Sequence, residues 1–389
     1  MPAVLRRLDH PAAPAAIALI GAAVFVVARL VFGTDGDITR FIVVGSANLS
    51  GHGLPAGVHV FAGTGYDGQF YFREALDPLT TARVAHGIVL DGDFRLQRVG
   101  YPLLAYVLSV GQPALVPDAL VAANVVALTA VGYLGGVVAR DSGRHALDGL
   151  FFVAFFGFVT TLARDLLEIV AAAFLLAALV AYRRGRFGLA GAMFACDVLT
   201  KESDVFVVAA FALVIAVKAL IGERGVSRFL PRAHLTWAIA AGAFGALQLV
   251  LYEAIGTVAA RSGARGNLGH PFAAPISAIR LYGAHPTTLA DSIWFAELAV
   301  LVVIVTTAVV VARGSGALAE EKFAFVVMIL LAVSLSTEVW YGQADFRAFA
   351  PVFELAGVVL MGSRIRLTFI YAIAGLALLV TYVHRVRFT

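Results

Sequence analysis

The chain has 389 residues, of which 60% are hydrophobic and only 14% are charged, and its mean hydropathy is +0.89. Soluble domains carry about 25% charged residues, so this composition excludes a water-soluble globular protein and indicates a polytopic membrane protein. The net charge of +4 does not indicate nucleic-acid binding, because the basic residues gather in short loops. The positive-inside bias of membrane proteins explains such loops. The single cysteine, Cys196, excludes an internal disulfide bond.

Eleven apolar runs follow one another along the chain. Each is predicted to be a membrane-spanning helix, because helices satisfy their own backbone polar groups in lipid. The first run is long enough to cross a bilayer and is interpreted as an uncleaved span. The runs lie at residues 14–33, 116–139, 147–163, 166–182, 187–200, 203–221, 235–256, 292–312, 323–337, 346–362 and 367–384. We therefore expect an all-α polytopic fold of about eleven transmembrane helices in one integral membrane domain, residues 1–389.

The orientation of the spans is predicted from the short basic loops. With the N-terminus in the cytoplasm, alternate counting places all of these loops on the cytoplasmic side, as the positive-inside bias requires. Their arginines are Arg6 and Arg7; Arg140 and Arg144; Arg183, Arg184 and Arg186; Arg224, Arg228 and Arg232; and Arg364 and Arg366. The tail at residues 384–387 disagrees with this count, and an even number of spans would reconcile it. We expect a multi-pass protein of the plasma (inner) membrane.

Two long segments, residues 34–115 and 257–291, then lie outside the cell. Within the first, residues 99–111 are apolar but too short to cross the bilayer, so we expect an interfacial helix there. The stretch GYDGQFYFREALDP, residues 65–78, combines charged and aromatic residues and is also expected to be a surface helix. One of its faces would present Asp67, Tyr71 and Glu74. Its apolar residues would lie among the lipid headgroups; they are Phe70, Phe72 and Leu76.

Three acidic groups from distant parts of the chain are expected at the outer face. They are Asp35 with Asp37, then Asp67, then Asp165 with Glu168. Carboxylates can act as general bases or bind a divalent metal. Asp37 could instead cap a helix that begins at the next residue, and Asp165 could simply end a span. For Asp67 the flanking glycines favour a functional role, because they permit close approach of backbone or ligand; these are Gly65 and Gly68.

Basic residues of the outer segments provide partners for these acids. They are Arg95 and Arg98, Lys201, and Arg347. Such side chains can hold phosphate, so acid beside base at a membrane surface suits a reaction on a lipid-linked phosphate. Lys201 with Glu202 could also be no more than an interfacial anchor. The histidines show no metal-ligand spacing. Acids inside the apolar runs should face protein or water; they are Asp197, Glu253, Glu297 and Glu354.

The motifs YDGQFY, QRVGYPLL, ARDLLE and LTKES, in this order, resemble bacterial membrane proteins of the GT-C glycosyltransferase superfamily. The closest likeness is to a group involved in cell-surface glycopolymer formation and related to mannosyltransferases of the PIG-V and dolichyl-phosphate types. It covers most of residues 30–205, and the later spans match mainly in hydropathy. The resemblance implies an inverting hexosyl or pentosyl transfer at the outer face. The donor would be a polyprenyl-phosphate sugar, and the acceptor an envelope glycan or lipid.

The resemblance also implies roles for individual residues. Asp67 would be the catalytic acid of the first external loop and would act as general base, with Asp37 as its rival; Asp165 or Glu168 would supply a second acid. The donor phosphate would be held by Lys201, Arg98 and Arg347, with Arg95, Tyr66 and Gln69 as further substrate-binding candidates. Relatives often have arginine where this chain has Lys201, which keeps the charge but loses the bidentate fork. If a divalent metal such as Mg or Mn is required, its ligands would come from Asp67, Asp165 and Glu168.

Two other classes of protein remain open from the sequence. A secondary transporter or a flippase of lipid-linked glycans would use the acids inside the spans, although inverted repeats and broken spans are not evident. A scaffold of an envelope-assembly complex would keep the motifs for structural reasons only. The concentration of acids in one long external loop favours an enzyme with an outward-facing active site.

Overall fold

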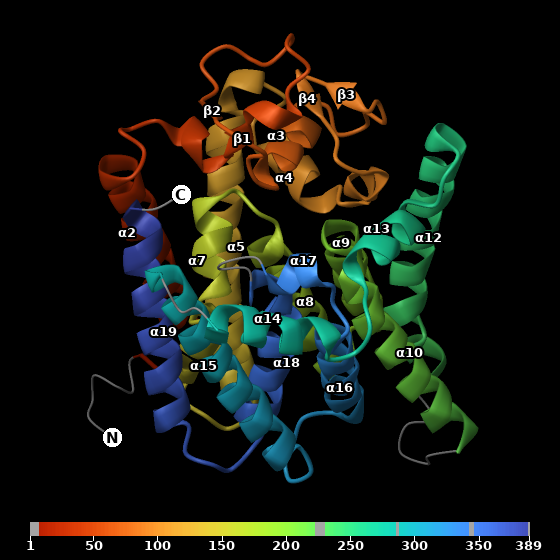
Figure 1. Ribbon diagram of the computed structural model, residues 1–389. Coiled ribbons are helices and arrows are strands. Elements are labelled where there is room, and N and C mark those ends of the chain that lie inside the picture. The colour runs from red at the N-terminus through yellow and green to blue at the C-terminus, as the bar shows by residue number, and fades with distance from the viewer. Residues whose placement is uncertain (1–7, 222–229, 285–287, 342–345, 388–389) are drawn as a thin grey trace.

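The computed structural model describes residues 8–221, 230–284, 288–341 and 346–387. Arg6, Arg7, Arg224 and Arg228, on which part of the predicted orientation rests, lie outside the described residues, as does His285. The described chain is a bundle of helices with an irregular cap at one end (Figure 1). The bundle helices are α2 (Ala12–Phe32), α5 (Val116–Asp141), α6 (Leu150–Val153), α7 (Gly157–Ala163), α8 (Glu168–Arg183), α9 (Phe187–Thr200), α10 (Val205–Leu220), α11 (Leu230–Ala233), α12 (Leu235–Ile255), α15 (Leu289–Ala312), α16 (Ala319–Val333), α18 (Ala350–Met361) and α19 (Thr368–Arg387).

Every predicted apolar run contains a helix or, at residues 147–163, a pair of helices. Six of the described helices are long and apolar enough to cross a membrane, or seven if α6 and α7, which are bent by 63° at their junction, form one span. The prediction is therefore confirmed at a coarse level: the chain is predominantly helical and has several helices that could span a membrane. Four bundle helices that correspond to predicted spans are shorter than the ~20 residues of a straight span and are not among the candidate spans, so the number eleven stays a prediction. These are α8, α9, α16 and α18.

The short loops at one end of the bundle hold one another through polar contacts. Asp9 accepts a hydrogen bond from the backbone of Ala146 (2.9 Å) and lies 3.9 Å from Arg140. Arg183 makes a bidentate pair with Glu321 at 2.6 and 2.8 Å, and Arg144 donates to the carbonyl of Met361 at 2.8 Å. The described basic loops therefore share the end at which α2 begins.

The first and last bundle helices run in the same direction. Near the end of α2, Arg29 donates a hydrogen bond to the carbonyl of Arg385, which lies near the end of α19. The start of α2 and the end of α19 consequently lie at opposite ends of the bundle (Figure 1). This arrangement is what an odd number of crossings produces, so the basic tail lies with the first long segment.

The cap consists mainly of the first long segment, residues 34–115. Its elements are η1 (Ile38–Phe41), β1 (Val44–Gly45), η2 (Ser46–Asn48), β2 (Val60–Phe61), α3 (Gly68–Leu76), β3 (Val84–Ala85), β4 (Ile88–Val89), η3 (Asp93–Gln97), α4 (Gly100–Leu108) and η4 (Pro113–Leu115). Strands β1 and β2 pair in parallel, and β3 and β4 pair antiparallel. Helix α4 has only nine residues and exposes Leu103 and Val107. A helix of this length is too short to cross a bilayer alone; its interfacial position stays a prediction, which its exposed apolar side fits.

The expectation for the stretch at residues 65–78 is wrong in one respect. It is helical, but every residue of α3 from Gly68 to Ala75 is buried. Phe70 and Phe72 are 2% and 0% exposed and belong to the protein core rather than to a surface among lipid headgroups. The physical reason is coverage by other parts of the cap and by the bundle, because α3 packs against α4 and α5.

The remaining connections complete the cap and the loops. They are η5 (Ala146–Gly149), η6 (Glu202–Asp204), α13 (Ala259–Asn267), α14 (Ala273–Ala284), α17 (Thr337–Trp340) and η7 (Phe346–Phe349). The predicted second external segment, residues 257–291, thus contains two helices. Isolated bridging residues Leu268 and Leu335 tie it to the end of α16.

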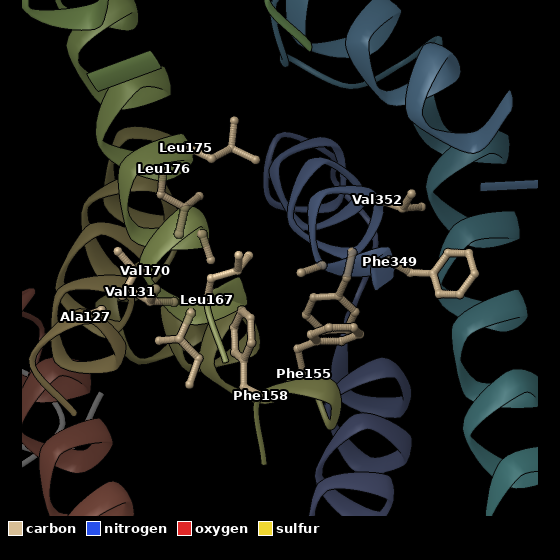
Figure 2. Packing of buried hydrophobic residues seen from close by; sticks show 14 of the residues in the cluster. Ala127, Val131, Phe155, Phe158, Leu167, Val170, Leu175, Leu176, Phe349 and Val352 are labelled. Atoms are coloured by element: carbon tan, nitrogen blue, oxygen red, sulfur yellow. The ribbon is translucent and has the colours of Figure 1, made fainter. Parts of the chain in front are cut away.

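The hydrophobic core lies between α5, α8 and α18 (Figure 2). Val131 of α5 and Val170 of α8 face one another, and Phe155, at the α6–α7 bend, lies toward the start of α18 (Figure 2). Phe155 stacks obliquely on Phe353, with ring centroids 4.8 Å apart. This packing fixes the first turn of α8 and the segment before α18, which both supply side chains to the site described below.

Acids inside the apolar runs mostly face protein, as predicted. Asp197, Glu297 and Glu354 are buried. Glu297 of α15 accepts a hydrogen bond from the hydroxyl of Thr381 of α19 at 2.6 Å, which is the interhelical contact expected of such a residue. Glu253 differs because it is exposed two residues before the end of α12.

Candidate functional site

A cavity of about 440 Å³ opens between the cap and the ends of several bundle helices. Its walls come from the segment before α3, η3, the start of α8, the α9–α10 connection, α13, the end of α16, α17 and η7. One set of lining residues is charged: Asp67, Asp91, Arg95, Arg98, Glu168, Lys201, Glu202, Glu338 and Arg347. Another set is apolar: Leu167, Met328, Leu331, Ala332, Leu335, Val339 and Val352. The cavity can therefore hold a ligand that is polar at one part and apolar at another.

Asp67 lies at the centre of the charged residues. It occupies the N-cap position of α3, but its side chain accepts no capping hydrogen bond from that helix. Its two oxygens instead lie 2.9 Å from Arg95 Nη2 and 2.6 Å from Arg347 Nη2. An aspartate at this position usually satisfies the first backbone N–H groups of its helix. Here the carboxylate is used for ion pairing across the cavity.

Two glycines allow the segment around Asp67 to pack closely on other backbone. A Cβ atom on Gly68 would lie 2.3 Å from the carbonyl oxygen of Arg164. Gly65 has φ +67° and approaches Gly45 equally closely. The expectation that these glycines permit close approach is confirmed, and the approaching group is backbone. Gln69 belongs to the same support, because it accepts from the Gly45 N–H (3.1 Å) and does not line the cavity.

Arg347 connects two acids from distant parts of the chain. Its guanidinium donates to Asp67 and also to Glu168, the first residue of α8. Glu168 accepts a further hydrogen bond from the Thr161 hydroxyl at 3.3 Å. Gly157, at the α6–α7 bend, lets η7 come this close, since a Cβ there would lie 2.8 Å from the Cα of Arg347. The Arg347 guanidinium carbon also lies 5.3 Å from the ring centroid of Tyr66, within cation–π range.

Arg95 in η3 and Arg98 at its C-cap also form ion pairs. Arg95 makes a bidentate contact with Asp91 at 2.9 and 2.8 Å, in addition to its contact with Asp67. Arg98 makes a bidentate pair with Glu202 at 2.8 and 2.6 Å and donates to the Tyr71 hydroxyl at 3.2 Å. The motifs QRVGYPLL and LTKES therefore meet through an arginine–glutamate pair.

Lys201 differs from the three arginines. Its ammonium donates to the carbonyl oxygen of Ala348 at 3.2 Å. Within the described ranges it has no carboxylate within salt-bridge distance, although it lines the cavity and is 8% exposed. Among the described cations of the cavity it is the one without an ion pair. Its role as a plain interfacial anchor is disfavoured by this burial.

The ion pairs determine the protonation of the central groups. Burial alone would raise the pKa of Asp67, but the charges of Arg95 and Arg347 outweigh burial and hold that pKa well below the usual range. Asp67 is therefore an anion at any physiological pH. Burial raises the pKa of Tyr71 to about 12 despite the nearby Arg98, so its hydroxyl stays protonated and can donate.

Two of the four predicted catalytic acids lie outside this cavity. Asp37 caps η1: it accepts from the backbone N–H and the hydroxyl of Thr39 at 2.9 and 2.7 Å, so the capping alternative is confirmed. Asp35 pairs with Arg40 at the surface. Asp165 is buried with φ +50°, and its carboxylate does not line the cavity. The structure thus brings together Asp67 and Glu168 of the acids, with Tyr66, Arg95, Arg98, Lys201 and Arg347.

The residues do not fit a divalent metal held by the predicted ligands. Asp67 and Glu168 both direct a carboxylate oxygen at Arg347, and Asp165 lies elsewhere. Across the described ranges, no group of three or more His, Cys, Asp or Glu side chains is placed to hold a metal ion. The chemistry of this site is therefore considered through its own side chains.

Sequence reasoning missed several lining residues. Asp91 lies four residues before Arg95 and could have been found by that spacing. Glu202 was noticed only as a neighbour of Lys201. Glu338 stands in a connection without periodicity, and nothing local marks it. The apolar residues at the end of α16 read only as part of a span.

These features describe a predominantly helical chain whose long apolar helices indicate a multi-pass membrane protein, with a charged and partly apolar cavity at the end of the bundle opposite its basic loops. No protein-family model, curated protein or solved structure matches the chain.

Proposed function

We propose that this protein is a GT-C-type membrane glycosyltransferase. It transfers a sugar from a polyprenyl-phosphate donor to an envelope glycan or lipid acceptor at the outer face of the plasma membrane. The observation that carries the proposal is the cavity itself, in which four cationic side chains and an apolar wall line the same space. A lipid-linked phosphate has this combination of charge and hydrocarbon.

The apolar wall suits the prenyl chain. Met328 and Leu331 lie at the end of α16, Leu335 follows two residues after that end, and Val352 from α18 lines the same cavity. Removing hydrocarbon from water is favourable by about 0.8 kcal/mol per CH₂ group, so several contacts along this wall would add substantially to donor binding. α16 belongs to the bundle, so a ligand lying along it would extend toward the lipid phase.

The charged wall suits the phosphate and the reacting sugar. Lys201 is available to the phosphate, because it would exchange only a hydrogen bond to a backbone carbonyl. The described lining side chains comprise four cations and five carboxylates, which gives a formal charge of −1. Carboxylates close to the anomeric carbon would stabilise the positive charge that develops on the sugar in an oxocarbenium-like transition state.

The proposed orientation follows from the two ends of the bundle. The described basic loops lie at the end where α2 begins, and the cavity lies at the other end. If the positive-inside bias holds, the cavity faces outward. Eleven crossings would agree with α2 and α19 running in the same direction.

The reaction we propose is a direct displacement with inversion. The acceptor oxygen forms a bond to the anomeric carbon while the bond between that carbon and the phosphate oxygen breaks. The phosphate leaves with the electron pair, and Lys201 balances its charge. Asp67 and Glu168 hold Arg347 beside the sugar. The acceptor hydroxyl loses its proton to a base.

The proposal is tested with purified protein in lipid nanodiscs and a panel of polyprenyl-phosphate hexoses and pentoses. We expect transfer to acceptor lipids or glycans. The variant Lys201→Ala should raise the apparent KM for the donor at least ~10-fold, as expected for the loss of a charge-assisted phosphate contact, and Lys201→Arg should restore part of it. Lys322→Ala is the matched control, because Lys322 lies at the opposite end and donates to Ser315. An unchanged donor KM in Lys201→Ala would refute the phosphate contact. Mass spectrometry of envelope polysaccharides from a deletion strain would identify the missing sugar.

One observation favours the alternative of a proton-coupled transporter or flippase. Asp197 and Glu354 are buried within the bundle; Asp197 interacts with a second acid, Asp204, and in the described part of the chain the Glu354 carboxylate has no hydrogen-bond partner. Buried acids of this kind carry protons in transporters. Movement of a lipid-linked sugar across liposomes that contain the protein, without formation of a glycosidic bond, would support that function over the enzyme.

A further inference from the structure

The carboxylates that line the cavity differ in whether they are paired. Four of them are within salt-bridge distance of an arginine: Asp67, Asp91, Glu168 and Glu202. The fifth, Glu338 of α17, makes no salt bridge or hydrogen bond with any residue that the structure describes, and it is exposed at the cavity. This difference bears on the general base, because the inverting displacement needs one group that takes the acceptor proton.

A paired carboxylate is a poor proton acceptor. Protonation of Asp67 would remove its attraction to both Arg95 and Arg347 and leave two guanidinium groups without that partner. The low pKa of Asp67 expresses this cost. Protonation of Glu168 would likewise remove a partner of Arg347, and protonation of Glu202 would remove the partner of Arg98. Glu338 can accept a proton without breaking any of these pairs.

The position of Glu338 is fixed by its neighbours. α17 follows α16 directly, and the Trp340 indole donates to the carbonyl oxygen of Ala332 at 3.2 Å. Before Glu338, the Ser336 N–H donates to the carbonyl oxygen of Asn267 in α13 at 2.8 Å. Glu338 therefore lines the cavity two residues after a backbone contact with α13, and the next residue, Val339, also lines the cavity.

From this arrangement we propose that Glu338 is the general base that takes the proton of the acceptor hydroxyl, and that the acceptor binds between α13 and α17. The inference rests on the proposed glycosyl transfer. The acceptor oxygen attacks the anomeric carbon, and its proton passes to a carboxylate oxygen of Glu338. The electron pair of the broken bond leaves with the lipid phosphate. Because Glu338 is exposed, it can then release the proton to water.

The surrounding elements contribute few other groups that titrate near neutral pH. The elements packed against α17 are α14 and η7, and their charged residues are Arg280 and Arg347. α13, which is linked to the segment before α17, carries Arg261 and Arg265. Arginines stay protonated throughout the useful pH range, whereas His270 lies on the segment whose backbone bonds to Ser334 and Val333 just before α17, so the pH dependence is read as the difference between wild type and the Glu338 variant.

The test compares Glu338→Gln with wild type and with Glu253→Gln, a control at an exposed glutamate of α12 that does not line the cavity. Expected results are a kcat at least ~100-fold lower in Glu338→Gln, as for loss of a general base, with the donor KM within about 3-fold of wild type. Folding should be unaffected, because no ion pair is lost, and thermal unfolding verifies this. The fall in rate toward acid pH should be absent from the variant. Formate added to Glu338→Ala should restore part of the rate.

Three results would overturn the assignment: turnover of Glu338→Gln within about 3-fold of wild type, an acid limb that persists in this variant, or an unchanged pH profile together with a loss of donor affinity. A loss of about tenfold or more in Asp67→Ala that formate rescues, with full activity in Glu338→Gln, would assign the base to Asp67 instead. Wild-type protein that binds the donor but forms no glycosidic bond would overturn the proposed function itself, and this outcome is separate from the first three.

Discussion

Gly68 provides the most direct test of how the cap positions the cavity. It is the first residue of α3 and directly follows Asp67. A Cβ atom at this position would lie 2.3 Å from the carbonyl oxygen of Arg164 and 2.7 Å from that of Ile42. Both oxygens are backbone atoms, so neither can rotate away. Gly68→Ala must therefore move α3 itself.

The size of this movement follows from the contact distances. Ordinary van der Waals contact begins at 3.4 Å, so the carbonyl of Arg164 and the start of α3 must separate by 3.4 − 2.3 = 1.1 Å. Asp67 lies 2.6 and 2.9 Å from its two arginines, and a shift of this size would break at least one pair. Overpacking costs about 1–3 kcal/mol, and a displacement of ~1 Å in a catalytic constellation costs about 100-fold in rate.

The assay combines thermal unfolding in detergent with the transfer reaction. An unfolding entropy of roughly 2.1 cal/mol/K per residue converts 3 kcal/mol into a Tm lower by about 3–4 °C. The control is Gly242→Ala in α12, where a Cβ meets nothing within 4 Å; alanine there should be neutral or stabilising by up to about 1 kcal/mol. If Gly68→Ala matched Gly242→Ala in both Tm and rate, the close approach of α3 to Arg164 would be refuted.

Two further predictions concern the central ion pairs and the topology. Asp67→Asn should lower stability by about 3 kcal/mol at pH 7, as for a partner removed from a buried pair. Because the folded-state pKa of Asp67 lies below its unfolded value of 3.8, this contribution is complete above that value and is lost as pH falls. The Tm difference between wild type and variant should shrink below about pH 4, and a constant difference would contradict the ion pairs. In a Cys196→Ser background, Leu79→Cys should react with an impermeant maleimide in intact cells and Arg186→Cys only after permeabilisation. The reverse pattern would invert the topology and remove the outward-facing site.

The helices could be predicted from the sequence because they depend on a local property. An apolar run in lipid must be helical, so runs such as residues 116–139 and 367–384 gave helices α5 and α19 close to their observed bounds. The short helices α9 and α18 were also found, but composition does not determine whether a helix of 14 or 12 residues crosses alone. That depends on how neighbouring helices cover it.

The burial of α3 could not be predicted by the same means. Phe70 and Phe72 have the composition of interfacial residues, and what covers them is a cap of short strands and turns without periodicity. The glycine positions were informative, because Gly65 and Gly68 indicated close approach before its partner was known. Gln69 illustrates the limit, since a side chain beside Asp67 in sequence holds the backbone of Gly45 and not a substrate.

Assignment of the site was partly possible because the chemistry of acid and base restricts the candidates. Asp67, Glu168, Lys201 and Arg347 were expected together and lie together. The role of Asp37 was undecided from the sequence, because an aspartate before a helix uses the same carboxylate oxygens for capping and for catalysis. The hydrogen bonds from Thr39 to Asp37 show that it caps η1. Pairing itself is a relation between distant residues, so a single sequence does not reveal which carboxylate is left unpaired.

The pairing pattern also orders the events that the proposed reaction requires. An incoming phosphate that took Arg98 would have to replace a bidentate glutamate at 2.8 and 2.6 Å, and one that took Arg347 would uncover both Asp67 and Glu168. Lys201 loses only a contact of 3.2 Å to a carbonyl oxygen. Buried charges are costly to leave without a partner, so the first contact of the phosphate is expected at Lys201. The arginine pairs then stay intact and keep Asp67 ionised beside the sugar. The group that accepts the proton must therefore be a carboxylate outside these pairs, which is the role proposed for Glu338.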